Sequence, residues 1–162
     1  MNQVVVCSTL RNCTHRLLKT FENWQKFCFV QNVVILDWDS ENPIHLHPKI
    51  IEKRSPKTFF LRVNNRPDFE FDRARNIVIK FALKCINPKP THILLIDSDV
   101  LILRTFPQEW FQNNIFVSGV RKTMGTILFP SHCFLKINGF DERRNFWEGG
   151  DRDFARRLSV SG

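Results

Sequence analysis

The sequence has no long hydrophobic run and no closely spaced pair of cysteines. Its apolar segments fall well short of the roughly 18 consecutive residues that a transmembrane helix needs. The opening residues, MNQVVVCSTLRN, also lack a basic region followed by a long apolar segment. We therefore expect neither a membrane anchor nor a signal peptide.

The cysteines are odd in number and form no C-x-x-C motif, which argues against a cysteine-based metal site. We expect reduced and mostly buried thiols, a pattern that suits a cytoplasmic protein better than a secreted one. The residues concerned are Cys7, Cys13, Cys28, Cys85 and Cys133.

The net charge of +8 predicts attraction to polyanions, phosphorylated ligands or anionic membranes. The basic residues are spread along the chain and form no tail, which favours a positive surface on a folded domain over a nucleic-acid-binding arm. With no repeat, linker or low-complexity segment, residues 1–162 are expected to form a single domain.

Apolar runs alternate with segments of helical periodicity, a pattern typical of an α/β fold with a mostly parallel central sheet flanked by helices. The expected order is a strand over 3–9, a helix over 12–27, strands over 32–37 and 58–63, a helix over 69–85 and a strand over 92–97. Beyond these we expect a short helix over 107–114, strands over 115–120 and 125–129, a helix over 131–139 and a last helix after 149.

Aspartates follow two of the buried strands. Asp37 ends the second strand, and Asp97 and Asp99 end the strand over 92–97, separated by Ser98. In open α/β sheets ligands bind at the carboxyl ends of strands, and paired carboxylates suit Mg²⁺ or Mn²⁺ with a nucleotide phosphate. The alternative is a loop with two solvated aspartates, since D-x-D occurs by chance in many proteins.

Four stretches, in this order, resemble the nucleotide-sugar glycosyltransferases of the GT-A fold, both family 2 and the galactosyltransferase-like enzymes. They are VVILDWDSE, FDRARNIVIKFA, ILLIDSDV and GTILFPSHCFLKINGFDERRNFWEGGDRDFARRL. The resemblance implies metal-dependent transfer of a sugar from a nucleoside-diphosphate sugar, expected to be UDP-linked, to a hydroxyl acceptor with inversion. Because members of these families generally continue past the last of these stretches, it also implies that residues 1–162 are a near-minimal catalytic core or a fragment of a longer protein. Neither a nucleic-acid partner nor a transmembrane segment is implied.

The same resemblance assigns roles to individual residues. It implies that Asp151 is the catalytic base and that Asp97 and Asp99 bind Mn²⁺ or Mg²⁺. The implied donor-nucleotide residues are Thr9, Asp37, Asp39, Arg73, Arg75, Asp97 and Ser98. The implied acceptor or sugar residues are Gly125, Asp141, Trp147, Gly150 and Asp153.

The chain departs from the family pattern at Gly150, where a glutamate is usual, and this puts acceptor hydrogen bonding in question. Other readings stay open for the neighbouring residues. Asp151 could cap the last helix, Asp141 could be surface charge paired with Arg143, and Trp147 could belong to the core.

Three other functions compete with sugar transfer. A nucleotidyltransferase would need a glycine-rich loop after the first strand, and VVVCSTLRN has no glycine. A basic nucleic-acid-binding module fits the charge, but the aromatic residues follow buried periodicity. A catalytically inactive relative is the third, because of Gly150.

Overall fold

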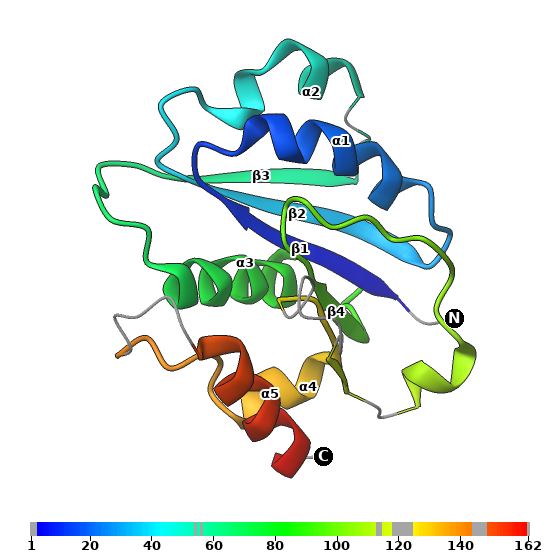
Figure 1. Ribbon diagram of the computed structural model, residues 1–162. Helices are drawn as coiled ribbons and strands as arrows, with labels where there is room; N and C mark the ends of the chain where they lie inside the picture. Colours follow the sequence, from blue (N-terminus) through cyan, green and yellow to red (C-terminus); the bar gives the residue numbers. More distant parts are fainter. Residues whose placement is uncertain are drawn as a thin grey trace.

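A six-stranded sheet forms the centre of the structure, a computed structural model that describes residues 3–53, 55, 57–112, 115–117, 125–143 and 149–161 (Figure 1). The strands are β1 (Val4–Leu10), β2 (Val30–Trp38), β3 (Thr58–Val63), β4 (His92–Leu95), β5 (Phe116–Val117) and β6 (Ile127–Pro130). The helices are α1 (Thr14–Gln25), α2 (Pro48–Lys53), α3 (Phe71–Cys85), α4 (Ser131–Lys136) and α5 (Gly150–Ser161), with short 3-10 turns η1 (Ile44–Leu46) and η2 (Gln108–Phe111).

The sheet is mixed and mostly parallel. Its strand order is β3-β2-β1-β4-β6-β5. Strands β1 to β4 run parallel to one another, while β6 is antiparallel to both β4 and β5. This confirms the predicted fold class, and it places the carboxyl ends of β1, β2 and β4 at one edge of the sheet.

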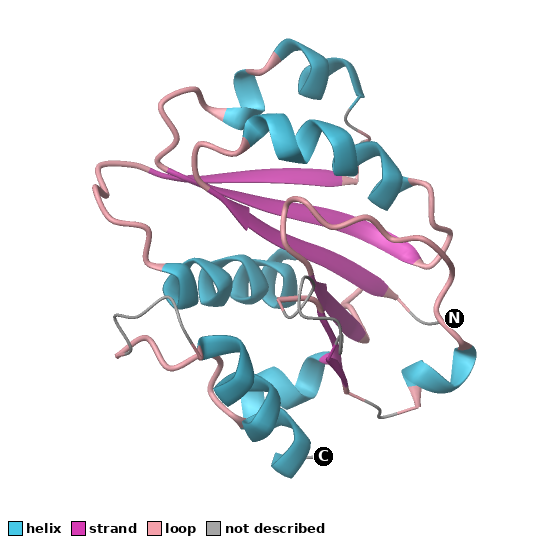
Figure 2. Ribbon diagram, viewed as in Figure 1, coloured by secondary structure: helices cyan, strands magenta, loops and turns pink. Residues whose placement is uncertain are grey.

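Alternating side chains of β1 build two separate cores. Val4 and Val6 pack with residues of α1 and α2 on one face, whereas Val5 and Cys7 pack with residues of α3, α4 and α5 on the other. Figure 2 shows the helices on both sides of the strands. Since both faces are covered, the inner strands are mostly apolar, as expected for a parallel sheet.

Most predicted elements are present, with ends shifted by a few residues. The segment TFFLRV is β3, as expected, and the two long helices are α1 and α3. The predicted strand over 115–120 is described only as β5, because residues 118–120 lie outside the described part of the chain.

The expectation of mostly buried cysteines is wrong, although all five thiols are free as predicted. Cys7 and Cys133 are buried and Cys13 is half-buried, but Cys28, in the turn before β2, and Cys85, the last residue of α3, are exposed. Within the described residues, none of the helices combines the length and the apolar character needed to cross a membrane.

Candidate active site

The D-S-D segment, residues 97–99, follows β4 and is held against α1. The Thr20 hydroxyl donates a hydrogen bond to the Ser98 carbonyl at 2.7 Å, and the Trp24 indole N–H donates to the Val100 carbonyl at 2.8 Å. Both donors come from α1, so this helix fixes the backbone that carries the two aspartates.

Asp97 faces the other side of the sheet, toward α3. Its Oδ1 accepts a hydrogen bond from Arg75 Nη2 at 3.3 Å. Burial raises the pKa of the Asp97 carboxyl, Arg75 opposes that change, and the nearby Asp151 and Asp99 raise the pKa further. A Cβ at Gly125 would lie 2.7 Å from Asp97 Cγ, so the carboxylate needs a glycine beside it.

Asp99 lies on the exposed side of the segment. Its Oδ2 is 3.2 Å from Arg16 Nη1, and about half of each side chain is exposed. An ion pair this exposed contributes little to stability. Asp99 can therefore exchange Arg16 for another cation at low cost.

Arg75 is the buried centre of the site, with 1% of its surface exposed. One nitrogen, Nη1, donates to Asp151 Oδ1, and the other, Nη2, donates to Asp97 Oδ1. The guanidinium carbon lies 3.8 Å from the ring centre of Phe71 and 5.3 Å from that of Phe140. A single cation thus joins two aspartates that come from distant parts of the sequence.

Asp151 belongs to the first turn of α5, together with Asp153. A negative charge at this end of a helix is favourable, as the capping interpretation requires. Its side chain is also 25% exposed and is bound to Arg75, so the carboxylate reaches both the protein interior and solvent. The two interpretations of Asp151 are therefore compatible.

Gly150 has a close neighbour that the sequence did not reveal. A Cβ at this position would lie 2.5 Å from Oδ1 and 2.8 Å from Oδ2 of Asp72, a buried residue in the first turn of α3. The Asp72 carboxylate thus fills the space into which a side chain at position 150 would extend.

Asp37 and Asp39 form a second group at the end of β2. Asp37 is completely buried and accepts hydrogen bonds from the backbone N–H of Ser40 at 3.0 Å, that of Ile44 at 2.9 Å, and Arg62 Nη1 at 2.9 Å. Arg62 Nη2 also lies 3.7 Å from Asp39 Oδ1. The Asp37 carboxylate therefore organises the loop after β2, and its donor-binding role stays a prediction.

Three further predicted donor residues lie around these groups. Thr9 and Ser98 are buried, at the end of β1 and within the D-S-D segment respectively. Arg73 is 41% exposed at its side chain and is bound to Glu70 Oε2 at 3.0 Å, which raises the pKa of Arg73. Arg73 is therefore partly exposed to solvent, whereas Arg75, two residues later, is buried.

Two of the predicted acceptor residues line another cavity, of about 410 Å³, between α3 and α5. Asp141 is bound to Arg143 at 2.8 Å, as the surface-charge interpretation requires. Asp153 is bound at 2.7 Å to Arg157, which donates to the Gly139 carbonyl after α4. Trp147 lies outside the described residues.

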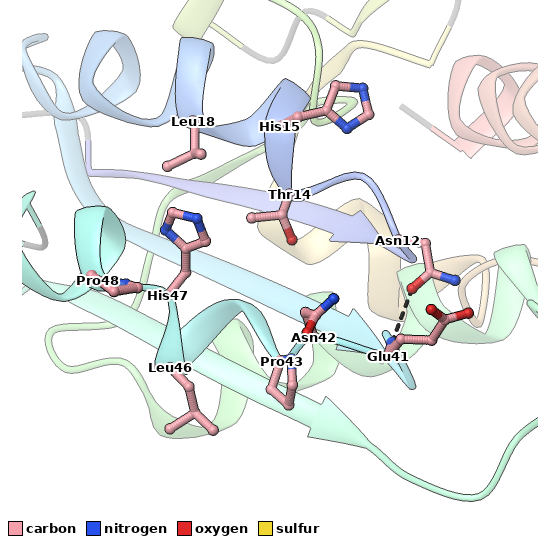
Figure 3. A pocket seen from close by; sticks show the side chains of 10 residues that line it. All are labelled: Asn12, Thr14, His15, Leu18, Glu41, Asn42, Pro43, Leu46, His47 and Pro48. Carbon is pink, nitrogen blue, oxygen red and sulfur yellow. Dashed lines mark hydrogen bonds between the residues drawn. The ribbon is translucent and has the colours of Figure 1, made fainter.

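A larger cavity, of about 840 Å³, lies between α1 and the segment after β2 (Figure 3). It contains none of the predicted site residues. Asn12 Oδ1 accepts a hydrogen bond from the Glu41 N–H at 2.9 Å and joins the turn after β1 to the turn after β2. The lining residues are Asn12, Thr14, His15, Leu18, Glu41, Asn42, Pro43, Leu46, His47 and Pro48.

Asp97 and Asp99 fit a divalent cation that prefers carboxylate oxygens and keeps water and phosphate as other ligands. The repulsion that raises the Asp97 pKa is one that a cation would relieve. Within the described ranges, no group of three His, Cys, Asp or Glu residues is arranged to hold a metal. The protein alone therefore offers two carboxylates rather than a closed cage.

Sequence reasoning missed Asp72, Arg62 and Arg16, and it gave Arg75 only a donor role. Arg62 is the one charged residue in the strand-like segment TFFLRV, and such a residue could have been predicted to have a buried acidic partner. Asp72 and Arg16 lie in helical first turns, where charges are common, so nothing in the sequence set them apart.

Solved structures resemble this fold closely. Residues 1–349 of S. aureus TarS match over 99% of this chain and 56% of that chain, with a TM-score of 0.66 and 15% sequence identity. The chain has the GT-A fold. The mannosyltransferase PcManGT from Pyrobaculum calidifontis, in complex with GDP-Man and Mn²⁺, matches with a TM-score of 0.65 at 13% identity, over 98% of this chain and 51% of that chain.

The catalytic domain of Drosophila beta1,4-galactosyltransferase 7, in complex with xylobiose, gives a TM-score of 0.64 at 14% identity. The match covers all of this chain and 63% of that one. This GT-A chain therefore spans between 51% and 63% of these three neighbours. No family model matches the sequence, and neither does any curated protein.

Proposed function

We propose that the chain is a metal-dependent glycosyltransferase that moves a sugar from a nucleoside-diphosphate sugar to a hydroxyl acceptor. The observation that carries the proposal is the connection of Asp97 to Asp151 through Arg75 at the carboxyl edge of the sheet. A metal carboxylate and a partly exposed carboxylate base, held at one site, are what direct displacement at an anomeric carbon requires.

In the proposed reaction the acceptor oxygen forms a bond to the anomeric carbon while the bond from that carbon to the diphosphate oxygen breaks. The diphosphate leaves with the electron pair. Asp151 accepts the proton of the acceptor hydroxyl, and attack from the side opposite the diphosphate inverts the anomeric centre. Its partial exposure gives an acceptor access to the carboxylate.

On the donor side, Asp97 and Asp99 would hold the metal, Mn²⁺ or Mg²⁺. When bound, the metal offsets charge on the departing diphosphate. The neighbours support this choice of donor and ion, since TarS was solved with UDP-GlcNAc and GalNAc-T7 with UDP and Mn²⁺. We propose a UDP-sugar as the donor, with Thr9, Asp37, Asp39 and Arg73 nearest the nucleotide.

The testing experiment is a donor screen in two stages. UDP, GDP and other nucleoside diphosphates are first compared with and without Mn²⁺ by thermal shift, because a ligand that binds only the folded state raises Tm. Release of nucleoside diphosphate from each nucleotide sugar is then measured, with water or simple sugars as acceptors.

We expect a Mn²⁺-dependent Tm increase with one nucleotide, and turnover that Asp151→Asn strongly reduces without removing the shift. A shift without any turnover would identify an inactive relative. Absence of any nucleotide effect, together with salt-sensitive binding to random RNA or DNA, would instead support the basic nucleic-acid module.

A further inference from the structure

We infer that Arg75 is a positioning residue that holds Asp151 and Asp97 at a fixed separation, and that it does not bind the donor diphosphate. This inference rests on the proposed function for the role of Asp151. The contacts of Arg75 itself stand independently of that function. This positioning role differs from the donor-binding role that the sequence resemblance implies for Arg75.

The guanidinium has little freedom to move toward a ligand. Arg75 is 1% exposed. Its guanidinium carbon lies 3.8 Å from the ring centre of Phe71 and 5.3 Å from that of Phe140. Phe71 precedes Arg75 by four residues on α3, which places both side chains on one face of the helix. Cation–π contacts of this kind strengthen when they are desolvated.

Phe140, the second ring beside the guanidinium, is also held in place by a residue of α3. Asn76, the next residue, donates to the Phe140 carbonyl at 3.0 Å and accepts from the Phe140 N–H at 2.8 Å. Asn76 is itself 2% exposed. Because one helix supplies the cation and holds both rings, the position of the guanidinium is set before any substrate arrives.

The charges on either side explain why an arginine is needed. Nη1 donates to Asp151 and Nη2 to Asp97, so one planar group satisfies two carboxylates at once. Asp151 is among the charges that raise the pKa of Asp97, which means that the two carboxylates interact electrostatically. Without the guanidinium these two partly buried carboxylates would repel each other.

Arg73 offers a natural comparison on the same helix. Its side chain is 41% exposed and forms an ion pair with the partly exposed Glu70, so it can turn toward a phosphate. Arg75 would have to abandon two carboxylates and two rings to do the same. The geometry therefore separates a candidate donor arginine from a positioning one.

The test is a double-mutant cycle with two readouts, using Arg75→Met, Arg75→Lys, Asp151→Asn and the double variant Arg75→Met/Asp151→Asn. Turnover is measured with the donor found in the screen, and donor binding is measured as the Tm increase with UDP and Mn²⁺. Lys84→Met is the matched control, because Lys84 is exposed on α3 and lines neither the site nor the cavity beside Asp141 and Asp153.

If Arg75 positions Asp151, Arg75→Met lowers kcat by about 100-fold, the effect of a displacement of about 1 Å, while the UDP-dependent shift persists at saturating Mn²⁺. The double variant is then no slower than Asp151→Asn alone, because the two residues act as one unit. Arg75→Lys keeps the charge but loses the planar fork, so its kcat lies between those of the wild type and Arg75→Met. Lys84→Met behaves as wild type.

Two results would overturn the inference. Loss of the UDP-dependent shift in folded Arg75→Lys that persists at saturating Mn²⁺ would show a donor contact, and additive effects on kcat would show action independent of Asp151. Should Arg75→Met fail to fold, the lysine variant and its double with Asp151→Asn complete the same cycle. Failure of the proposed function is seen separately, as a wild-type protein with neither turnover nor nucleotide shift.

Discussion

The carboxylate of Asp72 lies so close to Gly150 that a Cβ at position 150 would be 2.5 Å from its Oδ1. Asp72 comes from the first turn of α3 and Gly150 from the first turn of α5, immediately before Asp151. An acidic group is thus present beside the proposed base even though position 150 carries no side chain.

This relationship predicts that Gly150→Glu destabilises the protein, although glutamate is usual there in the family that the sequence resembles. The new side chain would collide with Asp72 and place like charges together, at a cost of about 1–3 kcal/mol for the overpacking alone. Urea unfolding measures the loss. We expect Asp72→Ala to relieve it when the two substitutions are combined.

Arg152→Glu is the matched control for this pair. It also adds an acidic residue to the first turn of α5, but at an exposed position. Equal destabilisation of Arg152→Glu and Gly150→Glu, or no relief in the double variant, would count against the contact with Asp72.

Gly125 gives a second prediction, through Asp97. Since a Cβ at Gly125 would lie 2.7 Å from Asp97 Cγ, Gly125→Ala should push the carboxylate aside and weaken Mn²⁺ binding. The measurement is the Mn²⁺ concentration that gives half of the Tm increase with UDP. We expect it to rise about tenfold or more, the effect of about 1.4 kcal/mol.

Ile50→Ala separates metal binding from general damage. Ile50 is 1% exposed and belongs to α2, in the core on the opposite face of the sheet from α3, so this variant should also be destabilised, by about 2–5 kcal/mol. Its Mn²⁺ dependence should match that of wild type. A Gly125→Ala protein with unchanged Mn²⁺ dependence would show that Asp97 does not need this space.

The strands were predictable because both faces of the sheet are covered, which makes their sequences mostly apolar. Val4 and Val5 point to opposite cores and are equally buried. The ends of these runs located the aspartates as well. The local sequence is enough to predict where these strands lie, because a buried strand requires a run of apolar residues.

The connections within the site were not predictable, because their partners are distant in sequence. Helical periodicity places an arginine outward by default, yet Arg75 is buried since Asp97 and Asp151 reach it from β4 and α5. The contact between Asp72 and Gly150 arises in the same way. Such contacts depend on how α3 and α5 are placed, which no local pattern encodes.

Asp37 leads to a prediction about stability. Its carboxylate is fully buried and accepts three hydrogen bonds, one of them from Arg62. Asp37→Asn replaces an accepting oxygen by a donor and removes the buried negative charge that pairs with Arg62 Nη1, which should cost about 3 kcal/mol. For a chain of this size we expect a Tm decrease of about 6–12 °C.

Asp68→Asn is the control, because Asp68 is exposed and contributes only its backbone carbonyl, to Trp38. It should leave Tm within about 2 °C of wild type. A small effect of Asp37→Asn on Tm, combined with loss of the UDP-dependent shift, would instead identify Asp37 mainly as a donor contact.

His92 makes folding stability depend on pH. Burial, and to a smaller extent the nearby His132, lower the pKa of His92 from its usual value of 6.5. Its ring packs edge-on against Phe111 at 5.3 Å, and its Nδ1 lies 3.1 Å from Thr91 Oγ1. Below pH 6.5 the unfolded chain takes up a proton that the folded protein resists, so stability falls as the pH drops toward the folded-state pKa.

Urea unfolding at pH 5.0, 6.0 and 7.5 measures this effect. The free energy of unfolding of the wild type should decrease as the pH is lowered from 7.5 to 5.0. His92→Gln should remove part of this pH dependence. His132→Gln should make the slope shallower, because it removes the second positive charge that opposes protonation of His92. An identical slope in wild type and His92→Gln would assign the pH dependence to other groups and refute a buried, neutral His92.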